Sequence, residues 1–255
     1  MAQSTRCLPP SEGSSQLNMW PDGAREIPDH PSESSVDHTI EDGEVVIRAV
    51  IMDLGGVLEI TPAAEAIKKW ETELALAPGD LNSRLRDVWA DGTIGSVSEQ
   101  EVHHAIQTIL HLDGERTAAF MDDMWAEYLG TLNVELVEFF ASLRPRYRTA
   151  ILSNSFVGAR EREQDRYQVE DMADLIIYSH EVGMAKPDPQ IYRLVCERLD
   201  VRPDEAIFVD DTEIAIEAAR KVGLQAIMFR DNEQAIAEIQ AHLRGIAGAW
   251  PAAGT

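Results

Sequence analysis

The sequence VVIRAVIMDLGG, residues 45–56, decides the fold of this chain. Its first eight residues are almost continuously β-branched or apolar, which is the pattern of a strand buried on both faces in a parallel sheet. The strand is predicted to stop at Asp53, because Gly55 and Gly56 follow and tolerate unusual backbone angles. An acidic residue therefore stands at the carboxyl end of a buried strand, the edge where ligands bind in open α/β sheets.

Strand and helix patterns alternate in the second half of the chain. Strands are predicted at 149–152, 175–178, 206–209 and 225–229, and helices around 136–143, at 189–199, at 213–222 and at about 232–243. This alternation is typical of a doubly wound parallel sheet with right-handed crossovers. We therefore expect an α/β fold with a Rossmann-like core.

Residues 62–130 have a helical period instead. Ile67, Trp70 and Leu74 share one helix face, and Ser98 begins a Ser-x-x-Glu capping box. No strand pattern interrupts this stretch. It is therefore predicted to form a small all-α module inserted into the α/β fold.

Composition excludes several classes of function. The 255 residues carry 22 Lys+Arg and 45 Asp+Glu, a formal net charge of −23, which is the wrong sign for binding nucleic acid or an anionic membrane. No apolar run approaches the roughly 20 residues of a membrane helix, and no signal-peptide pattern is present. Cys7 and Cys196 form no disulfide framework. We expect a cytoplasmic protein.

The two ends of the chain have a different composition from the rest. Residues 1–44 are rich in Ser, Pro and Gly and carry nine acidic residues against two arginines, so they are predicted to be a disordered acidic tail. Residues 246–255 are predicted to be a loose C-terminus.

Polar residues follow the predicted strands at one edge of the sheet. They are Asp53, Ser153, Asn154, Asp210 and Asp211, with Lys186 in the loop-to-helix junction after the 175–178 strand. Each residue alone is common in turns and helix caps, so the prediction rests on their joint placement.

This set suggests phosphate chemistry. Carboxylates that face one another repel unless a cation lies among them, and Mg²⁺ prefers such oxygen ligands. A phosphate could then lie between the metal, Lys186 and the Ser153 hydroxyl. Asp53 would be free to attack phosphorus and form an aspartyl phosphate.

Four segments resemble, in order, the four motifs of the haloacid dehalogenase (HAD) superfamily of hydrolases. They are VIMDLGGVL at 50–58, ILSNS at 151–155, EVGMAKPDP at 181–189 and IFVDDT at 207–212. The resemblance covers residues 46 to about 245. It implies a core formed by 45–61 and 146–245 and a helical cap formed by 62–145, although the helix at about 133–145 could belong to the core.

The resemblance also implies residue roles. Asp53 matches the nucleophile and a metal ligand. Ser153 and Lys186 match the pair that holds the phosphate, and Asn154 lies beside them.

The other metal positions follow in the same way. The backbone carbonyl of Gly55 matches a Mg²⁺ ligand, Asp211 matches the direct carboxylate ligand, and Asp210 matches a ligand or its partner.

Two positions depart from the pattern of the superfamily. Most of its phosphatases carry a second Asp two residues after the nucleophile, which protonates the leaving group, and Gly55 stands there instead. Loss of such an acid costs on the order of 10²–10⁴ in rate. Ala215 stands where an Asp or Asn often supports the lysine or metal. Glu59 is a hypothetical replacement acid.

The leading interpretation is a Mg²⁺-dependent phosphatase of a small phosphorylated metabolite. One alternative is a non-catalytic or weakly catalytic binding protein, favoured by Gly55 and Ala215. Another, ranked lower, is a metal-independent 2-haloacid dehalogenase, which would leave the Asp210-Asp211 pair without a role. Arg160, Arg162 and Arg166 are interpreted as a solvated, salt-bridged face of a predicted helix that also carries Glu161, Glu163 and Asp165. Substrate and oligomeric state stay open.

Overall fold

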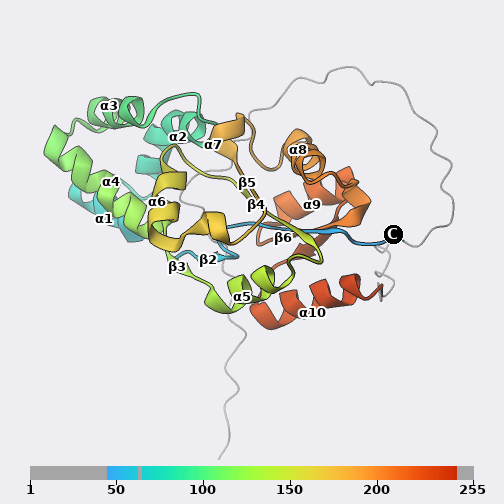
Figure 1. The fold of residues 1–255 in the computed structure, drawn as a ribbon. Helices are drawn as coiled ribbons and strands as arrows, with labels where there is room; N and C mark the ends of the chain where they lie inside the picture. The colour runs from blue at the N-terminus through green and yellow to red at the C-terminus, as the bar shows by residue number, and fades with distance from the viewer. Residues whose placement is uncertain (1–44, 63–64, 246–255) are drawn as a thin grey trace, which may run out of the picture.

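A five-stranded parallel sheet forms the centre of the molecule (Figure 1). The computed structural model describes residues 45–62 and 65–245, so the predictions for 1–44 and 246–255 and for Cys7 lie outside the described residues. The strand order is β5-β4-β1-β6-β7. The strands are β1 (Ala49–Met52), β4 (Arg148–Ser153), β5 (Leu175–Tyr178), β6 (Ala206–Asp210) and β7 (Gln225–Met228). The predicted α/β fold is confirmed.

Helices cover both faces of this sheet, and every residue of β1 is therefore buried. Val50 and Met52 face the cluster that includes α5 (Val134–Ser142), and α10 (Asn232–Leu243) packs on the same side. Ala49 and Ile51 face the opposite cluster, which includes α8 (Pro189–Leu199) and α9 (Glu213–Val222). The period of two along β1 thus places one apolar set on each face, as expected for a central parallel strand.

The first strand is shorter than predicted. The sheet ladder of β1 begins at Ala49, where β4 and β6 supply the partners Arg148 and Ala206. Val45 and Val46 precede this ladder and are 45% and 67% exposed. The apolar run therefore extends past the point where neighbouring strands are available to cover it.

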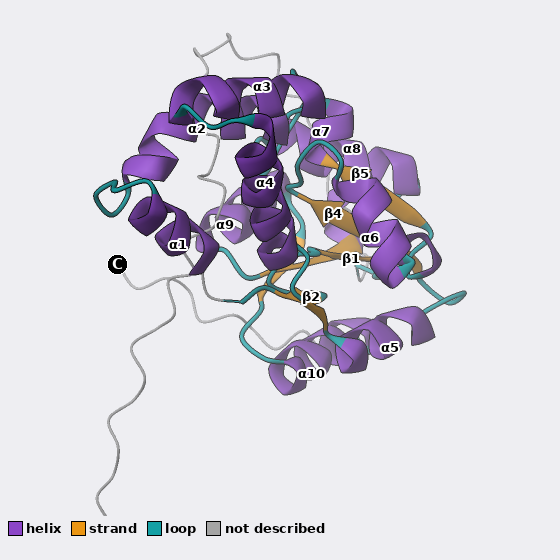
Figure 2. Cartoon of the chain, turned by 90° about the vertical axis from the view of Figure 1, so that its left-hand side faces the viewer, coloured by secondary structure: helices purple, strands orange, loops and turns teal. Residues whose placement is uncertain are grey.

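Four helices follow β1 in the sequence and precede α5. They are α1 (Glu65–Glu73), α2 (Asp80–Thr93), α3 (Glu99–Leu110) and α4 (Gly114–Tyr128), which gather on one side of the sheet in Figure 2. The predicted capping box at Ser98 is present, since Glu101 N–H donates to Ser98 Oγ and Ser98 N–H donates to Glu101 Oε2. None of the described helices is both long and apolar enough to cross a bilayer.

A short ribbon that the sequence did not predict joins these helices to the core. β2 (Glu59–Ile60) pairs antiparallel with β3 (Thr131–Leu132) just before α1 and just after α4. Two residues per strand are too few for a period-two pattern to be visible in the sequence.

The helical insert also shares its hydrophobic cluster with the loop that follows β4. Phe156 is fully buried among insert residues. Its ring centroid lies 5.8 Å from that of Trp89 and 6.1 Å from that of Trp125. A Cβ on Gly92 of α2 would lie 2.0 Å from the Phe156 ring, so glycine is required for this packing. The remaining helices, α6 (Ala159–Tyr167) and α7 (Ser179–Val182), follow β4 and β5.

Candidate active site

Three carboxylates meet at the carboxyl ends of the two central strands. Asp53 directly follows β1 and its N–H donates to the carbonyl of Val209, so the two strands hold it in register. Asp210 is the last residue of β6, and Asp211 follows it. Each of the three offers a carboxylate oxygen, and these oxygens lie within 4.8 Å of one another. Adjacent parallel strands thus gather side chains that are more than 150 positions apart in sequence.

Lys186 lies between two of these carboxylates. Its Nζ is 2.7 Å from Asp53 Oδ1 and 2.6 Å from Asp210 Oδ2. The lysine side chain is 4% exposed, so both ion pairs are sheltered from water. Despite the burial, which alone would lower it, the charges of Asp210 and Asp53 raise the pKa of Lys186. The ammonium is therefore a permanent charge at neutral pH.

Asn154 fixes the backbone that carries this lysine. Its Nδ2 donates to the Lys186 carbonyl at 2.8 Å, and its Oδ1 accepts from the Lys186 N–H at 2.7 Å. Both polar atoms of the Asn154 side chain therefore face the lysine backbone. Ser153, the last residue of β4, is 2% exposed at the same edge of the sheet.

Both oxygens of Asp210 have partners. Oδ2 accepts from Lys186, and Oδ1 accepts from the Thr212 N–H at 2.8 Å and the Thr212 hydroxyl at 2.6 Å. Burial would raise the pKa of Asp210, but the lysine charge and these hydrogen bonds lower it. Sequence reasoning did not single out Thr212, although a hydroxyl two residues after a strand-end Asp is a recognisable signal.

The two glycines after Asp53 differ sharply. Gly56 has φ of +79°, and a Cβ there would lie 2.3 Å from Asp211 Oδ2. Only glycine allows both that conformation and that approach. At Gly55 a Cβ would meet nothing nearer than Thr61 Oγ1 at 4.0 Å. The position of the missing general acid is therefore open space.

The donor set fits a hard divalent cation. Burial raises the pKa of Asp211 to about 6, with the Asp210 charge adding to the effect, and burial also raises the pKa of Asp53 against the lowering effect of Lys186. Three clustered carboxylates face a single ammonium, which leaves excess negative charge. A cation with oxygen ligands such as Mg²⁺ relieves this repulsion.

A second acidic group lies deeper, near the ribbon. Glu59 is 1% exposed, and burial, with the charges of Glu163 and Asp53, raises its pKa to about 10. Burial raises the pKa of Glu163 to about 7, although hydrogen bonds from Tyr178 and Tyr128 oppose this shift. Within the described residues, Oε1 of each glutamate has no hydrogen-bond partner.

The interpretation of the α6 helix as a solvated face was therefore wrong for Glu163. That residue is fully buried and accepts a hydrogen bond from the Tyr178 hydroxyl. The prediction is confirmed for Arg160, which pairs with Glu181 at 2.5 Å and Glu170 at 3.0 Å. Sequence reasoning missed Glu163 because most of the residues around it on the helix are charged.

Comparison with known proteins identifies the family to which this chain belongs. A family model described as haloacid dehalogenase-like hydrolase matches residues 36–223, and the chain belongs to this family of hydrolases. The chain is 29% identical over 191 residues to a phosphorylated carbohydrates phosphatase from Thermotoga maritima, covering 71% of this chain and 84% of the relative.

Two further similarities concern a larger protein and a solved structure. Bifunctional epoxide hydrolase 2 from Sus scrofa is 27% identical over 216 residues, covering 77% of this chain but only 39% of the relative, so the chain spans about two fifths of that protein. The crystal structure of a HAD family enzyme from Bacteroides thetaiotaomicron, in complex with magnesium and inorganic phosphate, has a TM-score of 0.63 and 22% identity over 72% of this chain and 94% of the other. This last similarity concerns the fold.

Proposed function

We propose that the protein is a Mg²⁺-dependent phosphatase that hydrolyses a small phosphorylated metabolite, with phosphorylated sugars or polyols as the substrate class. One observation carries the proposal: Lys186 bridges Asp53 and Asp210 while Asp211 completes a carboxylate cluster at the same strand ends. The Thermotoga maritima relative, of which the alignment covers 84%, supports the substrate class by its name.

The hydrogen bonds of Asp53 select the attacking oxygen. Oδ1 accepts from the Leu54 N–H at 2.8 Å and from Lys186 at 2.7 Å. Oδ2 is the oxygen left to attack phosphorus. The new Oδ2–P bond forms as the ester O–P bond breaks, and water then cleaves the aspartyl phosphate to release phosphate and restore Asp53.

The surrounding groups hold the phosphoryl oxygens. Lys186 supplies the fixed positive charge and Ser153 the hydroxyl donor, while Asn154 holds the lysine loop in place. Asp53, Asp211, the Gly55 carbonyl and Asp210 would hold Mg²⁺. When bound, the ion neutralises charge that develops on the phosphoryl oxygens.

Gly55 has no side chain that could donate a proton to the leaving oxygen of the substrate. We therefore expect the enzyme to prefer esters whose leaving oxygen departs without protonation. Glu59 is the proposed alternative donor, since its raised pKa of about 10 keeps the proton at neutral pH. If Glu59→Gln retains full turnover on every substrate, this role for Glu59 is refuted.

The test is a panel of phosphorylated sugars, polyols and aryl phosphates, assayed for phosphate release with Mg²⁺ and with EDTA. The matched control is Asp53→Asn, which keeps the shape of the side chain. Turnover that needs both Mg²⁺ and Asp53 supports the proposal. A protein inactive on the whole panel contradicts it, and halide release from 2-haloacids in EDTA would favour dehalogenation. A cytoplasmic location stays a prediction.

A further inference from the structure

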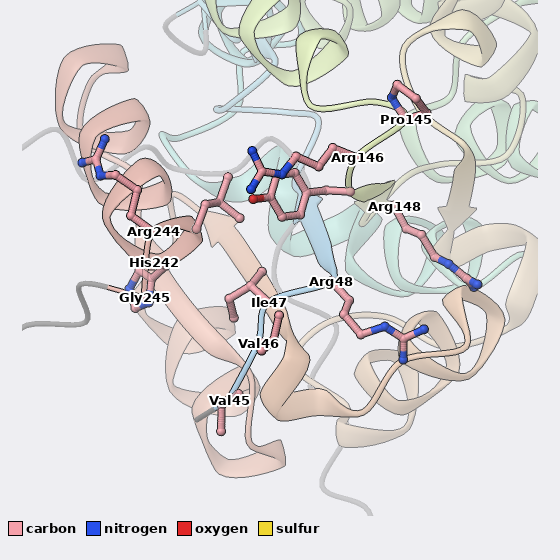
Figure 3. A pocket seen from close by; sticks show the side chains of 12 residues that line it. Val45, Val46, Ile47, Arg48, Pro145, Arg146, Arg148, His242, Arg244 and Gly245 are labelled. Carbon is pink, nitrogen blue, oxygen red and sulfur yellow. The ribbon is translucent and has the colours of Figure 1, made fainter. Parts of the chain in front are cut away.

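A pocket lies at the opposite end of the sheet from Asp53. Its cavity volume is about 600 Å³, within the usual range for small-ligand sites. The segment 45–48, which leads into β1, runs along it, with 145–148 on one side and 242–245 at the end of α10 on the other (Figure 3). The strand β1 separates this pocket from Asp53 by roughly 15 Å.

The charge of the pocket opposes that of the whole chain. Among the described residues, no carboxylate lines it, although the chain has about twice as many acidic as basic residues. Its lining includes Arg48, Arg146, Arg148, Arg244 and His242. Such a concentration of guanidinium groups is typical of sites for phosphate, sulfonate or carboxylate groups.

Two of the four arginines are already paired with acids. Arg48 lies 3.4 Å from Glu205, and Arg148 lies 3.5 Å from Asp200 and donates to the Leu199 carbonyl. None of these partners lines the pocket.

The other two arginines, Arg146 and Arg244, have no acidic partner among the described residues. In the described part of the chain, no carboxylate pairs with Arg146 or Arg244, and both are exposed. The only ring contact of Arg146 there is with Tyr147, at 5.4 Å from the ring centroid. Both arginines can therefore turn toward a ligand without breaking an ion pair.

The pocket also has apolar surface. Val45 and Val46 are the early, exposed part of the apolar run and are not covered by neighbouring strands. Leu243 and Tyr147 add half-buried apolar area. Exposed apolar surface next to unpaired cations suits a ligand with both an apolar body and an anionic group.

We propose that this pocket is a second binding site, for an organic anion whose charged group pairs with Arg146 and Arg244 while its apolar body covers Val45, Val46 and Tyr147. The overall charge of −23 does not prevent this, because the Debye length at physiological ionic strength is about 8 Å and screens acidic groups beyond the pocket. The site is separate from the proposed phosphatase centre and does not depend on it.

The test uses the full chain and two probes that differ in charge. Anilinonaphthalene sulfonate carries an aromatic body and a sulfonate, and N-phenyl-1-naphthylamine carries a similar body without the charge. Fluorescence titrations should show that the sulfonate binds at least tenfold more tightly than the neutral probe. Raising the NaCl concentration from 50 to 300 mM should weaken binding of the sulfonate probe several-fold.

Matched variants then locate the site. Arg146→Ala with Arg244→Ala should weaken sulfonate binding at least tenfold. Arg84→Ala with Arg86→Ala, which removes two exposed arginines from α2, should change it less than twofold. Amide shifts in NMR spectra should concentrate at 45–48 and 145–148.

Three results would overturn the proposal. They are equal affinity for the two probes, equal losses in the two double variants, and amide shifts confined to the neighbourhood of Lys186. Unchanged melting temperatures in both double variants would show that the comparison reports binding and not unfolding.

Discussion

The two ends of the parallel sheet use opposite charges in opposite surroundings. At the carboxyl end, Asp53, Asp210 and Lys186 are buried and hydrogen-bonded, so their geometry is fixed. At the amino end, Arg146 and Arg244 are exposed, and within the described residues neither forms an ion pair with a carboxylate. Buried charges act strongly but tolerate little change, whereas exposed charges act weakly and tolerate substitution. Substitutions should therefore cost far more at the carboxyl end.

The largest expected effect is on turnover. Asp53→Asn removes the nucleophile but keeps an oxygen that can accept the Leu54 N–H, so phosphate release should fall at least about 10³-fold with little loss of stability. The variant Arg146→Ala with Arg244→Ala should keep normal turnover. Asparagine at position 53 with activity within tenfold of the unchanged chain would contradict the nucleophile assignment.

The next effect is on stability. Lys186→Met leaves Asp53 and Asp210 buried without their shared counterion, which should lower the free energy of unfolding by about 3–5 kcal/mol. Arg146→Met, at the exposed end, should change it by no more than about 0.5 kcal/mol. Urea denaturation measures both. Added Mg²⁺ should restore part of the Lys186→Met loss, and equal midpoints for the two variants would refute the contrast.

Folding stability should depend on pH through the buried acid Glu163. Since the pKa of Glu163 is raised to about 7 in the folded protein, the folded state holds this proton more tightly than the unfolded state. Its contribution is fully present below the unfolded pKa of about 4.5 and is lost as the pH rises through 7. The contribution of Glu163 to stability should therefore fall from pH 5 to pH 8, by up to about 3 kcal/mol, and the raised pKa of Glu59 adds a loss of the same sign.

Glu163→Gln tests this effect, because the amide keeps an acceptor for the Tyr178 hydroxyl and does not ionise. The variant should show a flatter dependence of unfolding free energy on pH than the unchanged chain. Parallel pH profiles for the two proteins would show that Glu163 does not titrate in this range.

The smallest effect concerns the two adjacent glycines. Gly55→Asp enters open space and supplies the missing acid, so turnover of esters with poor leaving groups should rise about 10- to 100-fold. Gly56→Ala places a methyl group against Asp211 at a positive φ and should reduce turnover and stability. Steady-state rates on alkyl and aryl phosphates measure the difference. If the two variants behave alike, the loop is not arranged as described.

Much of the carboxyl end could be predicted from sequence. Asp53 and Asp210 each follow a strongly apolar run, and parallel strands bring such ends together. The partners within the site could not be predicted, because the pairing of Asn154 with the Lys186 backbone depends on how two loops approach each other.

The buried acids and the strand start escaped prediction for a similar reason. Glu163 lies on a helix with charged neighbours, and its burial depends on Tyr178 and Tyr128 from distant elements. Val45 and Val46 look like strand residues, but exposure depends on where neighbouring strands begin. Local pattern indicates what a segment can bury, and tertiary contacts determine what covers it.

The Phe156 ring joins the loop that follows β4 to the helical insert. It follows Ser153 by three residues and packs between Trp89 and Trp125 of the helical insert. A shift of the insert relative to the sheet would separate the Phe156 ring from these two tryptophans or would move the loop that carries it. The position of the helical insert and the position of the loop that follows Ser153 are thereby coupled through one aromatic side chain.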